Sequence, residues 1–150
     1  MWQSLESLRE FAPLDCLVLF LMYEDYWGAQ SSVAVYIASL PRTFSSPLYH
    51  SLLTNTTCLS GDEDVDNLLS TQHGEYMKSW SNISQVVVSN PTCFKGVMTK
   101  DRFLWAWFAV ATRSLYIDQK QPALVPFVDL LNHSPLAQVC QENDFCRCLK

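Results

Sequence analysis

The sequence predicts an α+β chain that is mostly helical up to about residue 115 and β-like after it. Three observations lead to this prediction: apolar residues recur at helical spacing, prolines and glycines stand where such helices begin and end, and an apolar run of β type follows Pro122. With 150 residues, of which 49% are hydrophobic and 17% charged, the chain has the length of one domain and enough apolar side chains for a core.

The charge and the cysteines limit the class of protein. The net charge is −5 and no run of Lys and Arg occurs, whereas a nucleic-acid-binding protein usually carries a basic patch. The apolar run 14–23 is shorter than the ~20 residues that span a bilayer. The first ten residues include Glu6 and Glu10, where a signal peptide would be basic. We therefore expect an intracellular protein, of the nucleus or the cytoplasm, with no membrane or nucleic-acid partner and with six reduced cysteines.

The first two elements are expected to be helices. Pro13 suits a first helical turn and Gly28 a helix end, which predicts a helix over about 13–26. A second, short helix is expected over 32–39, ending before Pro41. The buried stripe of the first helix would comprise Leu14, Leu17, Val18 and Leu21.

The middle of the chain predicts a loop and two further helices. Residues 41–60 are rich in Pro, Ser and Thr and are expected to be irregular. A helix is expected to start over 62–71 and to break at Gly74, and another is expected over about 76–88. Acidic residues favour a helix N-terminus, so the cluster at the start of the first of these is interpreted as a solvated helix start. It comprises Asp62, Glu63, Asp64 and Asp66.

The last helix opens at Thr99, a good capping residue, and is expected to run to about Thr112. Its aromatic residues are interpreted as core side chains rather than as a ligand cage. After it, the apolar run 123–131 is expected to be a strand, and 144–149 another.

A polar group interrupts the apolar run at its end. Asp129, Asn132 and His133 stand in the segment Leu124-Val-Pro-Phe-Val-Asp-Leu-Leu-Asn-His-Ser-Pro135. Burying such groups unpaired would cost about 1–3 kcal/mol each, so they must face water, cap one another or bind something. Considered without any relative, they favour a turn closed by Asn132. Arg113, at the end of the preceding helix, would likewise favour a surface ion pair.

Pro-x-x-Asp-x-x-Asn-His-Ser, at 126–134, resembles the signature of SET-domain protein methyltransferases, in the branch typified by the Rubisco large-subunit methyltransferase. Two upstream segments, 103–114 and 39–49, are similar to that branch in the same order. The resemblance implies S-adenosylmethionine as cofactor. It implies that Asn132 and His133 bind this cofactor, that Arg113 approaches its carboxylate and that Asp129 lies near the substrate amine.

The resemblance covers an incomplete SET domain. It implies the end of the first SET half over 1–40, a helical insert over 41–115 and the start of the second half over 116–150. The family's Gly-x-Gly segment and its Tyr-Gly tyrosine have no counterpart among the 150 residues. No catalytic residue is therefore assigned, and we expect residues 1–150 in isolation to bind the cofactor weakly or not at all and not to turn over.

The function implied is S-adenosylmethionine-dependent lysine N-methylation of a protein, histone or other, with a histidine acceptor as a variant. The alternative from another class is a non-catalytic truncated SET-like protein that binds a partner. A zinc site would need Cys140, Cys146 and Cys148, with His133, but their spacing is not that of paired Cys-x-x-Cys ligands. No metal is expected.

Overall fold

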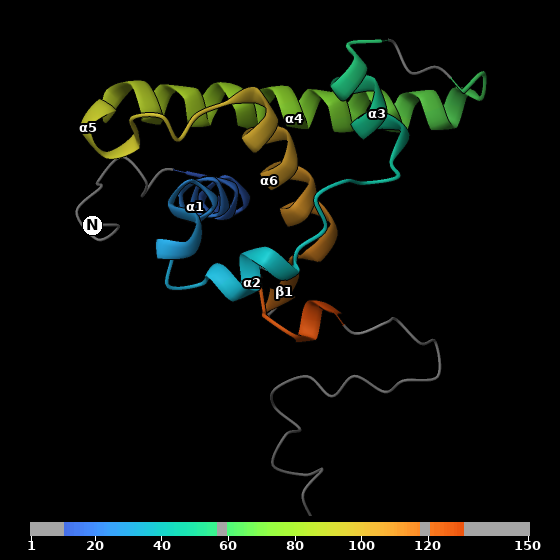
Figure 1. Cartoon of the computed structure of the whole chain (residues 1–150). Helices are drawn as coiled ribbons and strands as arrows, with labels where there is room; N and C mark the ends of the chain where they lie inside the picture. Colours follow the sequence, from blue (N-terminus) through green and yellow to red (C-terminus); the bar gives the residue numbers. More distant parts are fainter. Residues whose placement is uncertain (1–10, 57–59, 118–120, 131–150) are drawn as a thin grey trace, which may run out of the picture.

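A computed structural model describes residues 11–56, 60–117 and 121–130 of the chain. Its three main helices are α1 (Pro13–Trp27), α4 (Glu63–Ser89) and α6 (Lys100–Arg113). In Figure 1, α4 runs across the top, α1 lies below it seen end-on, and α6 descends from α4 toward the small sheet. The shorter elements are η3 (Gly28–Gln30), α2 (Ala34–Ser39), α3 (Pro47–Thr54), α5 (Pro91–Phe94), β1 (Leu115–Ile117), β2 (Gln121–Ala123) and η4 (Val128–Leu130).

Helix α1 follows the prediction closely. Pro13 occupies its first turn, and Gly28 ends it with a φ of 53°, a conformation that glycine adopts without steric cost. The helix contacts α2, α4 and α6, so it is covered on several sides. This is why its buried set is wider than the predicted stripe. Leu14 is 37% exposed, whereas the fully enclosed residues are Val18, Leu19, Leu21 and Met22.

Helix α4 is one continuous helix, so the predicted break at Gly74 is wrong. The acidic cluster lies at its start, as expected, and Asp62 also caps the helix, because its carboxylate accepts hydrogen bonds from the backbone N–H groups of Asp64 and Val65. A glycine costs a helix interior only about 1 kcal/mol. Leu69 and Tyr76 are buried on either side of Gly74, and their burial outweighs that cost.

The segment 41–60 was predicted to be irregular, which is wrong for α3. Pro47 opens this helix, and Asn55 ends it in the left-handed region at a φ of 56°. The segment is helical because Tyr49 is buried against the rings of Phe44 and Phe108, at centroid distances of 5.4 and 5.2 Å. Tertiary packing thus overrides the turn-rich composition.

Helix α6 supplies the centre of the core, as expected of its aromatic residues. The Thr99 hydroxyl accepts a hydrogen bond from the Arg102 N–H and opens the helix. Phe103 is fully buried, and its ring lies 5.0 Å from the ring centroids of both Tyr76 and Trp80 on α4. The aromatic residues of α6 therefore fix how it crosses α4.

A two-stranded antiparallel sheet follows α6. Strand β1 pairs with β2 from Leu115 opposite Ala123 to Ile117 opposite Gln121. The predicted strand over 123–131 is wrong, because β2 ends at Ala123 and the chain turns into η4. Phe127 has a φ of 72°, which is incompatible with an extended strand. The predicted strand over 144–149 lies outside the described residues.

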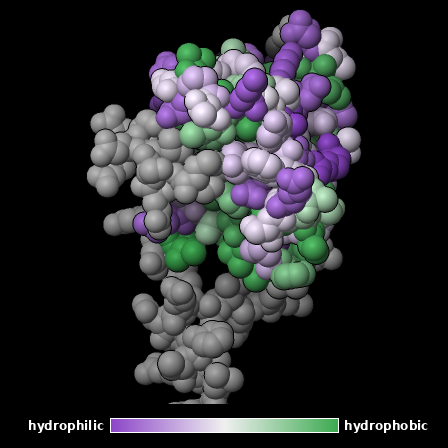
Figure 2. All heavy atoms as spheres, turned by 60° about the vertical axis from the view of Figure 1, so that its left-hand side comes forward, coloured by the Kyte–Doolittle hydropathy of each residue, from purple (hydrophilic) through white to green (hydrophobic). Residues whose placement is uncertain are grey.

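The surface mixes polar and apolar residues. Figure 2 shows apolar residues gathered toward the lower part of one face, at the height of α2 and β1 in Figure 1. The large exposed apolar side chains of α2, β1 and the segment 127–130 that contains η4 include Val35, Leu115, Tyr116, Ile117, Phe127, Val128 and Leu130. Within the described ranges, no helix is both long and apolar enough to cross a membrane.

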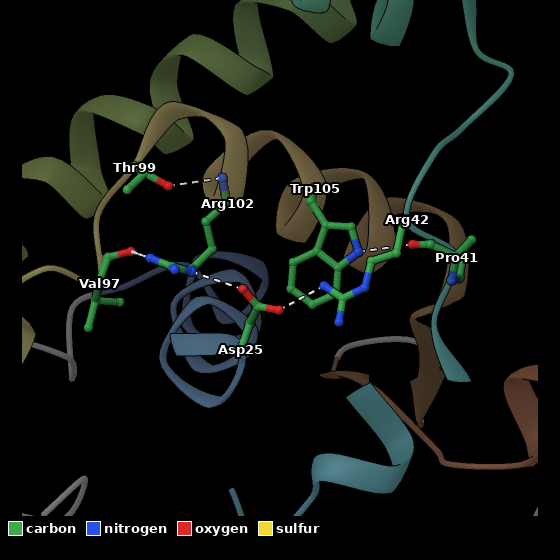
Figure 3. A network of polar contacts seen from close by, with 7 residues as sticks. All are labelled: Asp25, Pro41, Arg42, Val97, Thr99, Arg102 and Trp105. Atoms are coloured by element: carbon green, nitrogen blue, oxygen red, sulfur yellow. Dashed lines mark hydrogen bonds and ion pairs between the residues drawn. The ribbon is translucent and has the colours of Figure 1, made fainter. Parts of the chain in front are cut away.

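A charged network ties the start of α6 to α1. Figure 3 shows Asp25 between two guanidinium groups, with Arg42 at 2.7 Å on one oxygen and Arg102 at 2.9 Å on the other. Arg102 also donates to the carbonyl of Val97. The indole N–H of Trp105 donates to the carbonyl of Pro41, and Arg42 covers its ring.

We expect Asp25→Ala to lower the free energy of unfolding by about 2–3 kcal/mol, because the Arg102 guanidinium, only 20% exposed, loses its charged partner. Arg42→Ala is the matched control. Its side chain is 54% exposed, and such a pair contributes about 1 kcal/mol or less. Urea unfolding of both variants measures the two changes. Equal losses would show that Asp25 does not hold α6 through Arg102.

Candidate functional site

Three segments far apart in the sequence meet below the end of α6. Tyr36 comes from α2, Arg113 is the last residue of α6, and Asp129 is the middle residue of η4. The Tyr36 hydroxyl donates a hydrogen bond of 2.9 Å to Oδ2 of Asp129 across 93 residues of sequence. The Arg113 guanidinium donates through Nη1 to the backbone carbonyl of Asp129, also at 2.9 Å.

The carboxylate of Asp129 is fully buried, with 0% of its side chain exposed. Oδ2 accepts the hydrogen bond from Tyr36, but Oδ1 has no hydrogen-bond partner within the described part of the chain. An unsatisfied buried acceptor costs about 1–3 kcal/mol, and more when it carries charge. Asp129 therefore presents an oxygen that is suited to an N–H donor from a ligand.

Arg113 is held close to this carboxylate without forming a tight ion pair with it. Its Nη1 lies 4.0 Å from Oδ2, at the outer limit of a salt bridge, and 23% of its side chain is exposed. Within the described residues its only side-chain hydrogen bond goes to the Asp129 carbonyl. A guanidinium has five N–H donors, so Arg113 retains donors for an anionic group.

The sequence assigned Tyr36 no role at the site, although Val35-Tyr36-Ile37 resembles the segment that precedes 39–49 in the SET branch. A tyrosine in a short helix has no pattern that distinguishes it from a core residue. Burial raises the pKa of Tyr36, and the hydrogen bond to the Asp129 carboxylate and the negative charge of that carboxylate raise it further. The phenol is thus held protonated as a hydrogen-bond donor.

The structure thus brings together two of the four site residues taken from the sequence, Arg113 and Asp129. Asn132 and His133 lie outside the described residues. Histidines 50 and 73 are exposed, as expected. Within the described ranges, no group of His, Cys, Asp and Glu side chains is arranged to hold a metal ion. The cysteines considered for zinc, Cys140, Cys146 and Cys148, lie outside those ranges.

A separate cavity of about 510 Å³ opens between α1, α4 and α6. Asp15, 5% exposed, lies in its wall and accepts hydrogen bonds from the Ser79 hydroxyl at 2.5 Å and the Asn82 amide at 2.9 Å. Both carboxylate oxygens are therefore satisfied. Sequence reasoning missed this buried acid, because Asp15 in a first helical turn is also a common solvated residue. Its bonds explain it as a structural link between α1 and α4.

The raised pKa of Tyr36 predicts a pH dependence of stability. Unfolded tyrosine ionises near pH ~10, and the folded state holds the proton above that pH. The stability that Tyr36 contributes is therefore present below pH ~10 and is lost as the pH rises beyond it. Tyr36→Phe should flatten the fall in unfolding free energy between pH 10 and 11 by up to about 1.4 kcal/mol per pH unit. Urea unfolding over this range measures both slopes, and parallel slopes would contradict the assignment.

Comparison with known proteins gives relatives but no family model and no solved structure that matches. The chain is 30% identical to mouse SET domain-containing protein 4 over 91% of its own length and 34% of that protein. It is 30% identical to the ribosomal lysine N-methyltransferase set10 of Schizosaccharomyces pombe, over 89% of its length and 24% of that enzyme.

A plant enzyme matches similarly. The chloroplastic [fructose-bisphosphate aldolase]-lysine N-methyltransferase of Arabidopsis thaliana is 30% identical over 82% of the chain and 25% of the enzyme. The chain therefore spans between a quarter and a third of the length of these relatives. Over most of its own length, the chain is thus similar to curated SET-domain methyltransferases, at 27–30% identity.

Proposed function

We propose that this chain is part of an S-adenosylmethionine-dependent protein-lysine N-methyltransferase, and that Arg113 and Asp129 lie in its cofactor and substrate site. Two of the relatives are named lysine N-methyltransferases, which supports the reaction class. The observation that carries the proposal is the contact of Arg113 with Asp129, because it joins the two upstream residues of the predicted site at one point. Segments 1–40, 41–115 and 116–150 are proposed to be the end of the first SET half, the helical insert and the start of the second half.

The residues present fit the cofactor. S-adenosylmethionine carries a carboxylate, an ammonium group and the sulfonium methyl group that it supplies to the reaction. The guanidinium of Arg113 has N–H donors that suit a carboxylate, since the planar fork matches its two oxygens. We assign Arg113, Asn132 and His133 to the cofactor.

Asp129 is assigned to the substrate. An amine that accepts a methyl group must be neutral and held in line with the donor, so the protein contributes mainly position and a fixed electrostatic environment. The orphaned Oδ1 of Asp129 is a buried, immobile acceptor for one N–H of such an amine. Accepting that hydrogen bond would fix the direction of the nitrogen lone pair. The partner is thus a protein that presents a lysine side chain.

S-adenosylhomocysteine, which keeps the amino-acid end of the cofactor, tests the site. We expect weak but saturable NMR shift changes at Arg113 and Asp129 with millimolar ligand. Arg113→Gln should weaken binding about tenfold or more, because it removes charge-assisted hydrogen bonds to the carboxylate. Arg42→Gln, in the network of Figure 3, is the matched control and should leave affinity unchanged. Shift changes that lie elsewhere and survive Arg113→Gln would reject the site.

Turnover is a separate question. The 150 residues contain neither a Gly-x-Gly nor a Tyr-Gly sequence, which the SET enzymes resembled use for the cofactor and the acceptor nitrogen. We expect residues 1–150 in isolation to transfer no methyl group from tritiated S-adenosylmethionine to histones or to other proteins with exposed lysines. Radioactivity incorporated above the level of the Arg113→Gln variant would contradict this expectation.

A further inference from the structure

Two donors approach the same carboxylate oxygen at the candidate site. Oδ2 of Asp129 lies 2.9 Å from the hydroxyl of Tyr36 and 4.0 Å from Nη1 of Arg113. The neutral phenol therefore holds the hydrogen bond, and the guanidinium stays outside hydrogen-bond range. The same Nη1 bonds the backbone carbonyl of the same residue, so Arg113 is already adjacent to the carboxylate.

This arrangement is the reverse of what the charges favour. A guanidinium beside a buried carboxylate normally forms a short, often two-pronged pair, and such a bond is about twice as strong as a neutral one. Burial lowers the local dielectric and strengthens the attraction further. Closing the gap from 4.0 Å to hydrogen-bond distance requires Arg113 to move by only about 1 Å.

The position of the phenol explains why the pair stays open. Tyr36 packs against the hydrophobic core, and its neighbour Ile37 is 4% exposed, so α2 fixes the direction of the ring. On the other side, the N–H of Asp129 donates to the carbonyl of Val125 and fixes the start of η4. The hydroxyl is thereby held against Oδ2, in the place that a second guanidinium N–H would take.

We propose that Tyr36 is a positioning residue that holds Asp129 and Arg113 apart, so that Arg113 keeps hydrogen-bonding capacity for a carboxylate and Asp129 keeps it for an amine. Arg113 keeps N–H donors for an anionic group, and Asp129 keeps Oδ1 for an N–H donor. The use of these groups by a cofactor and an acceptor amine rests on the proposed function. The separation of the two charges does not, because it is a property of the unliganded chain.

The first test is a double-mutant cycle of Arg113→Gln and Asp129→Asn, made in the natural chain and again with Tyr36→Phe. The cycle compares how strongly Arg113→Gln changes the unfolding equilibrium constant when residue 129 is Asp and when it is Asn. The ratio of these two changes is the coupling factor. We expect a factor below about three in the natural chain and about tenfold or more with Tyr36→Phe, because the guanidinium then closes on Oδ2, which the phenol no longer occupies. The same factor in both backgrounds would overturn the proposal.

Tyr76→Phe is the matched control. It removes the hydroxyl of another buried tyrosine, 3% exposed, on α4, and should leave the coupling factor unchanged. If the Asp129→Asn variant fails to fold, NMR can detect closure of the Arg113–Asp129 ion pair in another way. The measured quantity is then the rate at which the Arg113 guanidinium rotates about its Nε–Cζ bond. Tyr36→Phe should slow this rotation several-fold, since a two-pronged pair restrains it, and an unchanged rotation rate would overturn the proposal.

The second test uses two ligands of one scaffold. S-adenosylhomocysteine carries the amino-acid group, and 5′-methylthioadenosine lacks it. Tyr36→Phe should weaken binding of the first about fivefold or more and change the second less than about twofold, because only the first needs the open guanidinium. An equal loss of affinity for both ligands would show that Tyr36 has only a structural role and would overturn the proposal. Equal affinity of the natural chain for both ligands would reject the assignment of Arg113 to the amino-acid carboxylate, and the coupling factor would then decide the proposal about Tyr36.

Discussion

The buried carboxylate of Asp129 is the constraint on which the lower part of the molecule depends. With 0% of its side chain exposed, it must find donors within the fold, and the phenol of Tyr36 supplies one from 93 residues away. Arg113 adds a bond to the backbone of the same residue. These bonds connect α2, the end of α6 and η4, three elements that share few other restraints. The carboxylate is thus both a structural link and the chemical centre of the candidate site.

The rest of the fold fixes where Arg113 stands. Helix α6 is anchored near its start, where Arg102 pairs with Asp25 on α1 and the next residue, Phe103, packs against Tyr76 and Trp80. A helix rises 1.5 Å per residue, so fixing its start and its rotation also fixes its last residue. The packing at the start of α6 therefore determines where Arg113 lies at the end of this helix, in the candidate site. The interior is packed too tightly for α6 to slide without loss of these contacts.

The sequence anticipated those parts of the fold that local chemistry decides. Thr99 and Asp62 open helices because their oxygens satisfy free N–H groups; Thr99 was recognised as a capping residue, and Asp62 as part of an acidic helix start. The prediction from the sequence was wrong where tertiary packing determines the structure. Nothing in the local sequence shows that Tyr49 will be buried and that its segment will therefore be helical. At the site, motif order singled out Arg113 and Asp129, whose roles remain predictions. Tyr36 was missed because its role is created by a contact that only the tertiary fold makes.

Two destabilising features lie within three residues of each other in the segment that carries Asp129, and both are explained if this segment binds a ligand. Phe127 adopts a φ of 72°, which a residue with a side chain avoids at a cost on the order of 1–2 kcal/mol, and Oδ1 of Asp129 is buried without a partner. A sequence shaped only by stability would replace both residues. Such costs concentrate at binding sites, where an acceptor held ready loses nothing further when its ligand arrives. The phenol of Tyr36 occupies Oδ2, the oxygen that Arg113 approaches to 4.0 Å, and so opposes closure of an ion pair that would turn a binding carboxylate into a structural one.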